Sequence, residues 1–349
     1  MKSINKALIY RDWKYTKWFI PIIFAILFFM NIPFIISKNS YAGVTVYDFG
    51  FNLGSWIVAG VLLIMVSVMF SFDRNLSSYS LAASMPFTRK EIILSKWSVG
   101  VYNILISYCS IYVILNIILI VNDCWMEKIG FITFSITFNL MFLLCVFGFF
   151  LMIQAINGTV FLGSFISALF IAIPYSFVHI IHNIYSFYQG RYLVPSIIVN
   201  TKKVMNSIFV FITYILNINP LIDADTMKYL KQNPIDELMI YVNYEYHFKY
   251  SGLAFYMVSL IVLFKLSIKL FSKSKLEING RITTVEGVNK IYKIVLAYYT
   301  GYLFHTLFAG IFDGAFFRLD LVVLFYFVLP IPLYFLMGKI IVKYNRRYE

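Results

Sequence analysis

The run VGVYNILISYCSIYVILNIILIV, which covers Val99–Val121, contains no charged residue. A helix needs roughly 20 apolar residues to cross the hydrocarbon core of a bilayer. Lipid admits only helices and closed barrels, because their backbone polar groups are paired internally, and this run is too long for a barrel strand. The run therefore predicts a transmembrane helix and an all-α fold.

Seven further apolar runs of similar length lie on either side of it. The hydrophobic share of the 349 residues is 61% and the charged share is 13%, whereas a soluble domain is about half apolar and a quarter charged. We therefore expect one polytopic transmembrane domain, residues 1–349, with about eight spans. The other seven spans are Trp18–Ile36, Leu53–Phe72, Phe131–Ile153, Thr159–Ile181, Gly252–Phe271, Ile294–Phe312 and Leu321–Val342.

The lysines and arginines around the spans predict the orientation, because cytoplasmic segments are enriched in them. With the N-terminus inside, most basic residues fall in four cytoplasmic segments or at the inner ends of the adjoining spans; the segments are 1–17, 73–98, 272–293 and 343–349. Both termini are then cytoplasmic. This orientation accounts for much of the net charge of +13, so we expect no nucleic-acid partner.

Residues 182–251 form the longest segment between predicted spans, and we expect them outside the cell. Within this segment Ser207–Ile218 is apolar but only about a dozen residues long, too short to cross the bilayer unaided. Two interpretations stay open: the stretch dips into the outer leaflet, or it is wholly extracellular. If it crossed instead, the basic segment from Lys265 to Lys293 would move outside.

Residues 1–17 carry five basic residues together with Trp13 and Tyr15. Basic side chains beside aromatic ones suit a helix that lies in the inner membrane interface. A plain topogenic flank, which only fixes the orientation of the first span, would have a similar composition. We expect the interfacial helix.

The inner loop 73–98 contains the most informative motif, Pro86-Phe-Thr-Arg-Lys-Glu91. Thr88 and Glu91 have the spacing of a capping box, in which the hydroxyl accepts from the third helical N–H and the carboxylate accepts from the cap N–H. A helix is therefore predicted to start here and to run through Trp97 into the third span. This turn would present a compact basic pair to a partner protein, although an ordinary capped loop has the same pattern; the pair is Arg89 and Lys90.

The wider stretch Ser84-Met-Pro-Phe-Thr-Arg-Lys-Glu-Ile-Ile-Leu-Ser-Lys-Trp97 resembles the inner loop of ABC-2 type ABC-transporter permeases of Gram-positive bacteria. Leu8-Ile-Tyr-Arg-Asp-Trp-Lys14 resembles the start of such permeases. In that family the loop forms a coupling helix that docks in a groove of the ATPase subunit. The resemblance implies that six residues make this contact: Pro86, Phe87, Thr88, Arg89, Lys90 and Glu91.

The chain departs from the family pattern at two points. Members often carry an acidic residue and a glycine before the loop, and here only the acidic residue, Asp73, is present. The family core has six spans, so Ile294–Val342 would be an added pair.

The resemblance implies a permease subunit of an ABC exporter in the bacterial cytoplasmic membrane, with no catalytic role and no cofactor in this chain. ATP and Mg would bind a partner ATPase, and a second permease copy or a sister permease would complete the pair. Aromatic residues make up 19% of the chain, which favours an apolar or amphipathic cargo. Permeases of staphylococcal exporters of phenol-soluble modulins, which are amphipathic toxin peptides, are similar in length and character, so such peptides or antimicrobial peptides are the expected cargo.

Two other functions stay open. A membrane sensor or resistance component would bind an extracellular ligand through residues 182–251. An ion-driven secondary transporter would need acidic residues within its spans, and the predicted spans hold none away from their ends. The sequence also lacks a Gly-x-x-x-x-Gly-Lys-[Ser/Thr] nucleotide loop, so an energy-coupled transporter of this sequence needs a separate ATPase.

Polar side chains inside the predicted spans are costly in lipid and need a reason. His305 lies in the middle of the seventh span and either lines a path or forms a hydrogen bond between helices. His179 and His182 have a spacing that can hold a metal, but no third ligand is evident and we expect no metal site. Gln154 and Asn157 are expected to cap the fourth span, and kinks are expected at Pro174, Pro330 and Pro332.

Overall fold

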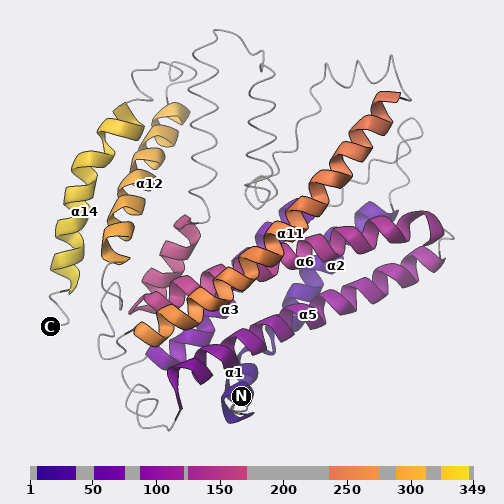
Figure 1. Cartoon of the computed structure of the whole chain (residues 1–349), viewed down its shortest axis with the longest axis horizontal. Coiled ribbons are helices and arrows are strands. Elements are labelled where there is room, and N and C mark those ends of the chain that lie inside the picture. The colour runs from indigo at the N-terminus through magenta and orange to yellow at the C-terminus, as the bar shows by residue number, and fades with distance from the viewer. Residues whose placement is uncertain are drawn as a thin grey trace. The chain divides into compact units, whose positions relative to one another are not determined.

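A computed structural model describes residues 6–36, 51–74, 87–121, 125–170, 236–274, 288–311 and 324–345 (Figure 1). These residues form helices and short connections, with no strand among them, which confirms the predicted all-α class. The labelled elements are α1 (Lys6–Thr16), α2 (Phe19–Ile36), α3 (Phe51–Arg74), α5 (Arg89–Val121), α6 (Trp125–Ile156), α11 (Asp236–Lys273), α12 (Val288–Ile311), η3 (Leu324–Val328) and α14 (Pro330–Asn345).

Three helical segments in the described ranges are long and apolar enough to cross a membrane: Arg89–Val121, Ile136–Ile156 and Leu253–Lys273. A fourth is obtained if α1 and α2, which meet at a bend of 48°, are counted as one broken span. These helices support a membrane protein. The predicted number of eight spans and the cytoplasmic termini stay predictions, and residues 182–235, including Ser207–Ile218, lie outside the described residues.

The sixth and eighth predicted spans differ from the observed helices in extent or continuity. The helix α11 begins at Asp236, so the last part of the segment predicted to be extracellular is helical and continuous with the sixth predicted span. The last predicted span is broken: η3 ends at Val328, and α14 starts at Pro330. The second observation confirms the interruption expected at Pro330, because a proline ring is tolerated at the first position of a helix and disrupts its interior.

The chain divides into two compact units. The first contains Met1–Met69, Pro86–Met152 and Val204–Ile268, and the second contains Phe70–Met85, Ile153–Lys203 and Lys269–Glu349. Helices α3, α6 and α11 contribute residues to both units.

Within the first unit, the directions of the other helices are described relative to α5. The pairs Asp12–Lys96 and Thr16–Asn103 rise together in number, so α1 runs parallel to α5. The pairs Met69–Lys96 and Met65–Asn103 run in opposite order, so α3 is antiparallel to α5.

The remaining helices of this unit extend the same pattern. The helix α6 is antiparallel to α5, with which it forms a long hairpin (Figure 1), because Trp97 contacts Phe147 and Tyr112 bonds to Thr133. The helix α11 is parallel to α6, because the ring of Tyr256 contacts Phe138 whereas Leu263 lies beside Gly148. In this unit α3 and α6 are therefore antiparallel to α5, whereas α6 and α11 run parallel.

In the second unit, the C-terminal helices form an antiparallel pair. The helices α12 and α14 lie side by side (Figure 1). Lys293, near the start of α12, lies beside Tyr334 and Gly338 of α14, whereas Gly301 approaches the backbone of Phe325 in η3. The two helices therefore run in opposite directions.

Candidate functional site

The predicted capping box is present at the start of α5. The backbone N–H of Thr88 donates to Glu91 Oε2 at 2.8 Å, and the backbone N–H of Glu91 donates to Thr88 Oγ1 at 3.3 Å. Arg89 is the first residue of the helix. Thr88 and Lys90 are exposed, Phe87 is half-buried, and Pro86 lies outside the described residues. The prediction of a fixed helix start is therefore confirmed, whereas the ATPase contact stays a prediction.

The same helix continues without a break into the third predicted span (Figure 1). Its 33 residues correspond to a rod about 50 Å long. A displacement of the capped start would therefore move the whole length of α5, because the backbone hydrogen bonds of a helix resist bending.

Roughly two turns beyond the cap, a buried ion pair joins α5 to α1. Lys96 Nζ lies 3.7 Å from Asp12 Oδ1, and the two side chains are 0% and 3% exposed. Ser95 Oγ donates to Asp12 Oδ2 at 2.6 Å, and Arg11 Nη2 donates to Asp12 Oδ1 at 2.8 Å. Lys96 Nζ also donates to the carbonyl of Met69 on α3. Both charges are therefore compensated, and three helices meet at this cluster.

A second set of hydrogen bonds continues the contact along α5. Asn103 Nδ2 donates to Thr16 Oγ1 at 3.0 Å and to the Thr16 carbonyl at 3.2 Å. Ser107 Oγ donates to the carbonyl of Ile20 at 3.1 Å. The carbonyl of Thr16 lies at the end of α1, where intrahelical partners are lost, and Ile20 lies in the first turn of α2. These donors therefore hold the bend against α5.

The opposite side of α5 is held by aromatic packing. Trp97 Nε1 donates to Ser267 Oγ on α11 at 2.7 Å, and the Trp97 ring packs edge-on against Phe147 of α6 and Phe264 of α11. Two glycines allow this approach: a Cβ at Gly100 would lie 2.0 Å from the Phe147 ring, and a Cβ at Gly148 would lie 2.5 Å from the Trp97 ring. The first half of α5 is thus fixed to α1, α3, α6 and α11.

Sequence reasoning missed this buried cluster. Lys96 was expected in a cytoplasmic segment on the strength of its charge, but its side chain is buried against Asp12 and Met69. A signal was present in the sequence, because Asp12 is the sole acidic residue among residues 1–17. It shares one helical face with Leu8 and Thr16, and all three are buried.

The other polar residues singled out in the sequence lie elsewhere. His305 lies on α12, and His179 and His182 lie outside the described residues. Asn157 Nδ2 donates to the carbonyl of Ile153 at 2.7 Å and to the Tyr292 hydroxyl at 3.0 Å, which confirms its role at the end of α6. Across the described ranges, no three His, Cys, Asp or Glu side chains gather where they could hold a metal ion.

Arg74 makes a similar cap in the second unit. Its Nη2 donates to the carbonyls of Gln154 and Ala155 at 3.3 and 3.4 Å, in the last turn of α6. A cation is favoured there by the helix dipole. Burial lowers the pKa of Arg74 to about 10, although the neighbouring carboxylate of Asp73 acts in the opposite direction. Arg74 therefore stays charged at neutral pH.

Comparisons of the chain with protein-family models, with curated proteins and with solved structures found no match.

Proposed function

We propose that the chain is the transmembrane permease subunit of an ABC exporter of the ABC-2 type. The observation that carries the proposal is the architecture of α5. It starts at a capped turn whose Thr88 and Lys90 are exposed, and it continues unbroken towards Val121. Near its start it is fastened to other helices by the Asp12–Lys96 pair and by the Trp97 cluster, which comprises Trp97, Phe147, Phe264 and Ser267. A coupling element needs both an accessible end and a rigid attachment.

The proposed mechanism is mechanical. ATP binding draws two partner ATPases together, and each ATPase moves the turn at Arg89 and Lys90. Because α5 is bonded to α1 and α3 through Asp12, Lys96 and Met69, the movement reaches these helices as well. ATP can drive transport only if its binding favours one arrangement of the helices over the other.

The directions of the helices support the proposed topology of eight spans with both termini in the cytoplasm. In the first unit α6 and α11 run parallel, as the pairs Phe138–Tyr256 and Gly148–Leu263 require. Two parallel spans need an odd number of crossings between them. One crossing by the fifth predicted span meets this need, whereas an additional crossing by Ser207–Ile218 does not.

The proposed protein is an integral component of the bacterial cytoplasmic membrane and no enzyme itself. Its partners are an ABC ATPase, which holds ATP and Mg, and a second permease copy or a sister permease. The exposed apolar faces of α5 and α11, which include Ile117, Ile120 and Val258, suit contact with lipid or an apolar path. The proposed cargo is an amphipathic peptide of the phenol-soluble-modulin type, by analogy with permeases of similar character.

Co-purification tests the proposal. We expect the chain to retain its partner ABC ATPase when the two are expressed together, and we expect Arg89→Glu with Lys90→Glu to reduce that retention at least tenfold without loss of membrane insertion. The matched control is Lys265→Glu with Lys269→Glu, which reverses two exposed charges on α11 outside the turn. If the wild-type chain holds no ATPase, or if both charge reversals release it equally, the proposal is wrong.

A further inference from the structure

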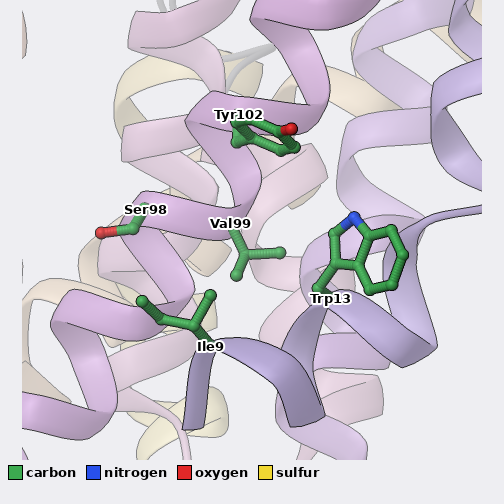
Figure 2. Close-up of a pocket in the computed structure, with 5 residues that line it drawn as sticks. All are labelled: Ile9, Trp13, Ser98, Val99 and Tyr102. Carbon is green, nitrogen blue, oxygen red and sulfur yellow. The ribbon is translucent and has the colours of Figure 1, made fainter. Parts of the chain in front are cut away.

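A groove of about 390 Å³ lies between α1 and α5 (Figure 2). Ile9 and Trp13 come from α1, and Ser98, Val99 and Tyr102 come from α5 (Figure 2). The Ser98 hydroxyl donates to the carbonyl of Leu94 in its own helix at 2.9 Å, so it presents little free polarity to the groove. The lining is therefore mostly apolar, and its volume falls in the range of about 300–1,000 Å³ typical of ligand sites.

The surface of α1 around the groove is basic. The acidic residue of this helix, Asp12, is turned inward and bonded to Ser95 and Arg11. Lys14 is exposed, and Lys17 Nζ lies 5.7 Å from the ring centre of Trp13 and 5.5 Å from that of Trp18. An ammonium group therefore sits directly beside a residue that lines the groove.

The groove has an apolar lining, and lysines and aromatic rings lie beside it at the bend between α1 and α2. These features indicate what kind of ligand it would bind. Tryptophan and tyrosine side chains favour the level of the lipid headgroups, and basic residues there attract anionic lipids. We propose that this groove binds an anionic phospholipid, with one acyl chain along Ile9, Val99 and Tyr102 and the phosphate beside Lys17. The site does not depend on the ATPase, so it stands or falls separately from the proposed function.

Fluorescence quenching by phospholipids with brominated acyl chains tests the site on the full-length protein in detergent. The difference between the wild type and Trp13→Phe isolates the signal of Trp13 from the other tryptophans. We expect brominated phosphatidylglycerol to quench this signal at a concentration several-fold lower than brominated phosphatidylcholine. Lys14→Gln with Lys17→Gln should raise the phosphatidylglycerol midpoint about 25-fold, since each of the two basic residues near an anionic lipid contributes about a factor of five.

Two bulky substitutions distinguish lipid binding in the groove from lipid binding elsewhere on the surface of the protein. Ser98→Phe places a ring in the groove and should raise the phosphatidylglycerol midpoint at least fivefold. Val113→Phe adds a ring at another exposed position of α5, about 22 Å along the helix, and should leave the midpoint unchanged. Lys265→Gln with Lys269→Gln is the matched charge control. A thermal unfolding curve for each variant excludes loss of fold, and the lysine variant keeps the test valid if Ser98→Phe fails to fold.

Two results would overturn the proposal. Equal midpoints for the two lipids, unchanged by the lysine substitutions, would mean that Trp13 meets only bulk lipid. Absence of Trp13 quenching, with crosslinking from position 13 to a second copy of the chain, would mean that a protein surface covers the groove instead.

Discussion

At the scale of single residues, the buried pair of Asp12 and Lys96 carries a large desolvation cost. Transfer of an ion out of water costs several kcal/mol, and a buried pair offsets this cost only when further hydrogen bonds surround it. Here Ser95 and Arg11 donate to the carboxylate, and the ammonium donates to the carbonyl of Met69. Removal of Asp12 leaves the Lys96 ammonium buried without its carboxylate, whereas Asp12 keeps its ion pair with Arg11 when Lys96 is removed.

We therefore expect Asp12→Leu to lower the free energy of unfolding by about 3–5 kcal/mol, the usual cost of breaking a buried pair. The double variant Asp12→Leu, Lys96→Met should recover part of this loss, because no buried ammonium remains. Thermal unfolding of the purified protein in detergent measures both values. Equal losses in the single and double variants would show that Ser95 and Arg11, rather than Lys96, determine the stability contributed by Asp12.

The capping box and the buried pair show which residue contacts can be predicted from sequence. Thr88 and Glu91 are three residues apart, so their geometry follows from the helix itself, and the predicted hydrogen bonds are present. Asp12 and Lys96 are joined only when α1 folds onto α5. The local pattern around Lys96, a basic residue just before an apolar span, is the same whether the side chain is exposed or buried.

At the scale of the helices, the close approach of α5 and α6 depends on Gly100. A Cβ there would lie 2.0 Å from Cζ of Phe147, and the Phe147 ring is itself buried and packed against Trp97. The ring cannot move away without displacing the Trp97 cluster. Small residues serve this purpose widely in membrane helices, because they let two backbones approach.

We expect Gly100→Ala to lower the free energy of unfolding by about 1–3 kcal/mol, the usual range for overpacking. Gly60→Ala on α3 is the matched control, since a Cβ at Gly60 meets no atom within 4 Å. That substitution should be neutral or slightly stabilising, because alanine favours a helix more than glycine does. The unfolding assay used for the Asp12 variants serves here too. A loss at Gly60 as large as that at Gly100 would contradict the packing argument.

The existence of the long helices could be predicted from hydrophobicity, and their packing could not. The run Val99–Val121 and the capping motif together predicted α5 from its first turn onward. The extension of α11 back to Asp236 was missed, because Tyr and Asn residues in that region do not resemble a span. Helices α1, α3, α6 and α11 all pack against α5. This packing depends on individual contacts such as the Trp97–Ser267 hydrogen bond, which the periodicity of the sequence does not predict.

At the scale of the whole molecule, the helix directions and the distribution of basic residues both favour the proposed topology. The charge argument uses lysines and arginines near the ends of spans. The direction argument uses only contacts inside the first unit, where α6 and α11 run parallel. Both arguments would fail together if Ser207–Ile218 crossed the membrane, since α11 would then enter from the other side.

Reporter fusions decide this point directly. A reporter active only in the cytoplasm should be active at the N-terminus and after Glu349, and it should be inactive when inserted after Gly190 and after Gln232. The last two positions flank Ser207–Ile218, so their agreement is the critical comparison: a stretch of about a dozen residues is too short to carry the chain across a hydrocarbon core about 30 Å thick. Activity after Gln232 but not after Gly190 would establish a crossing between them. The basic segment from Lys265 to Lys293 would then lie outside the cell, and the parallel order of α6 and α11 would no longer fit consecutive traversal of the bilayer.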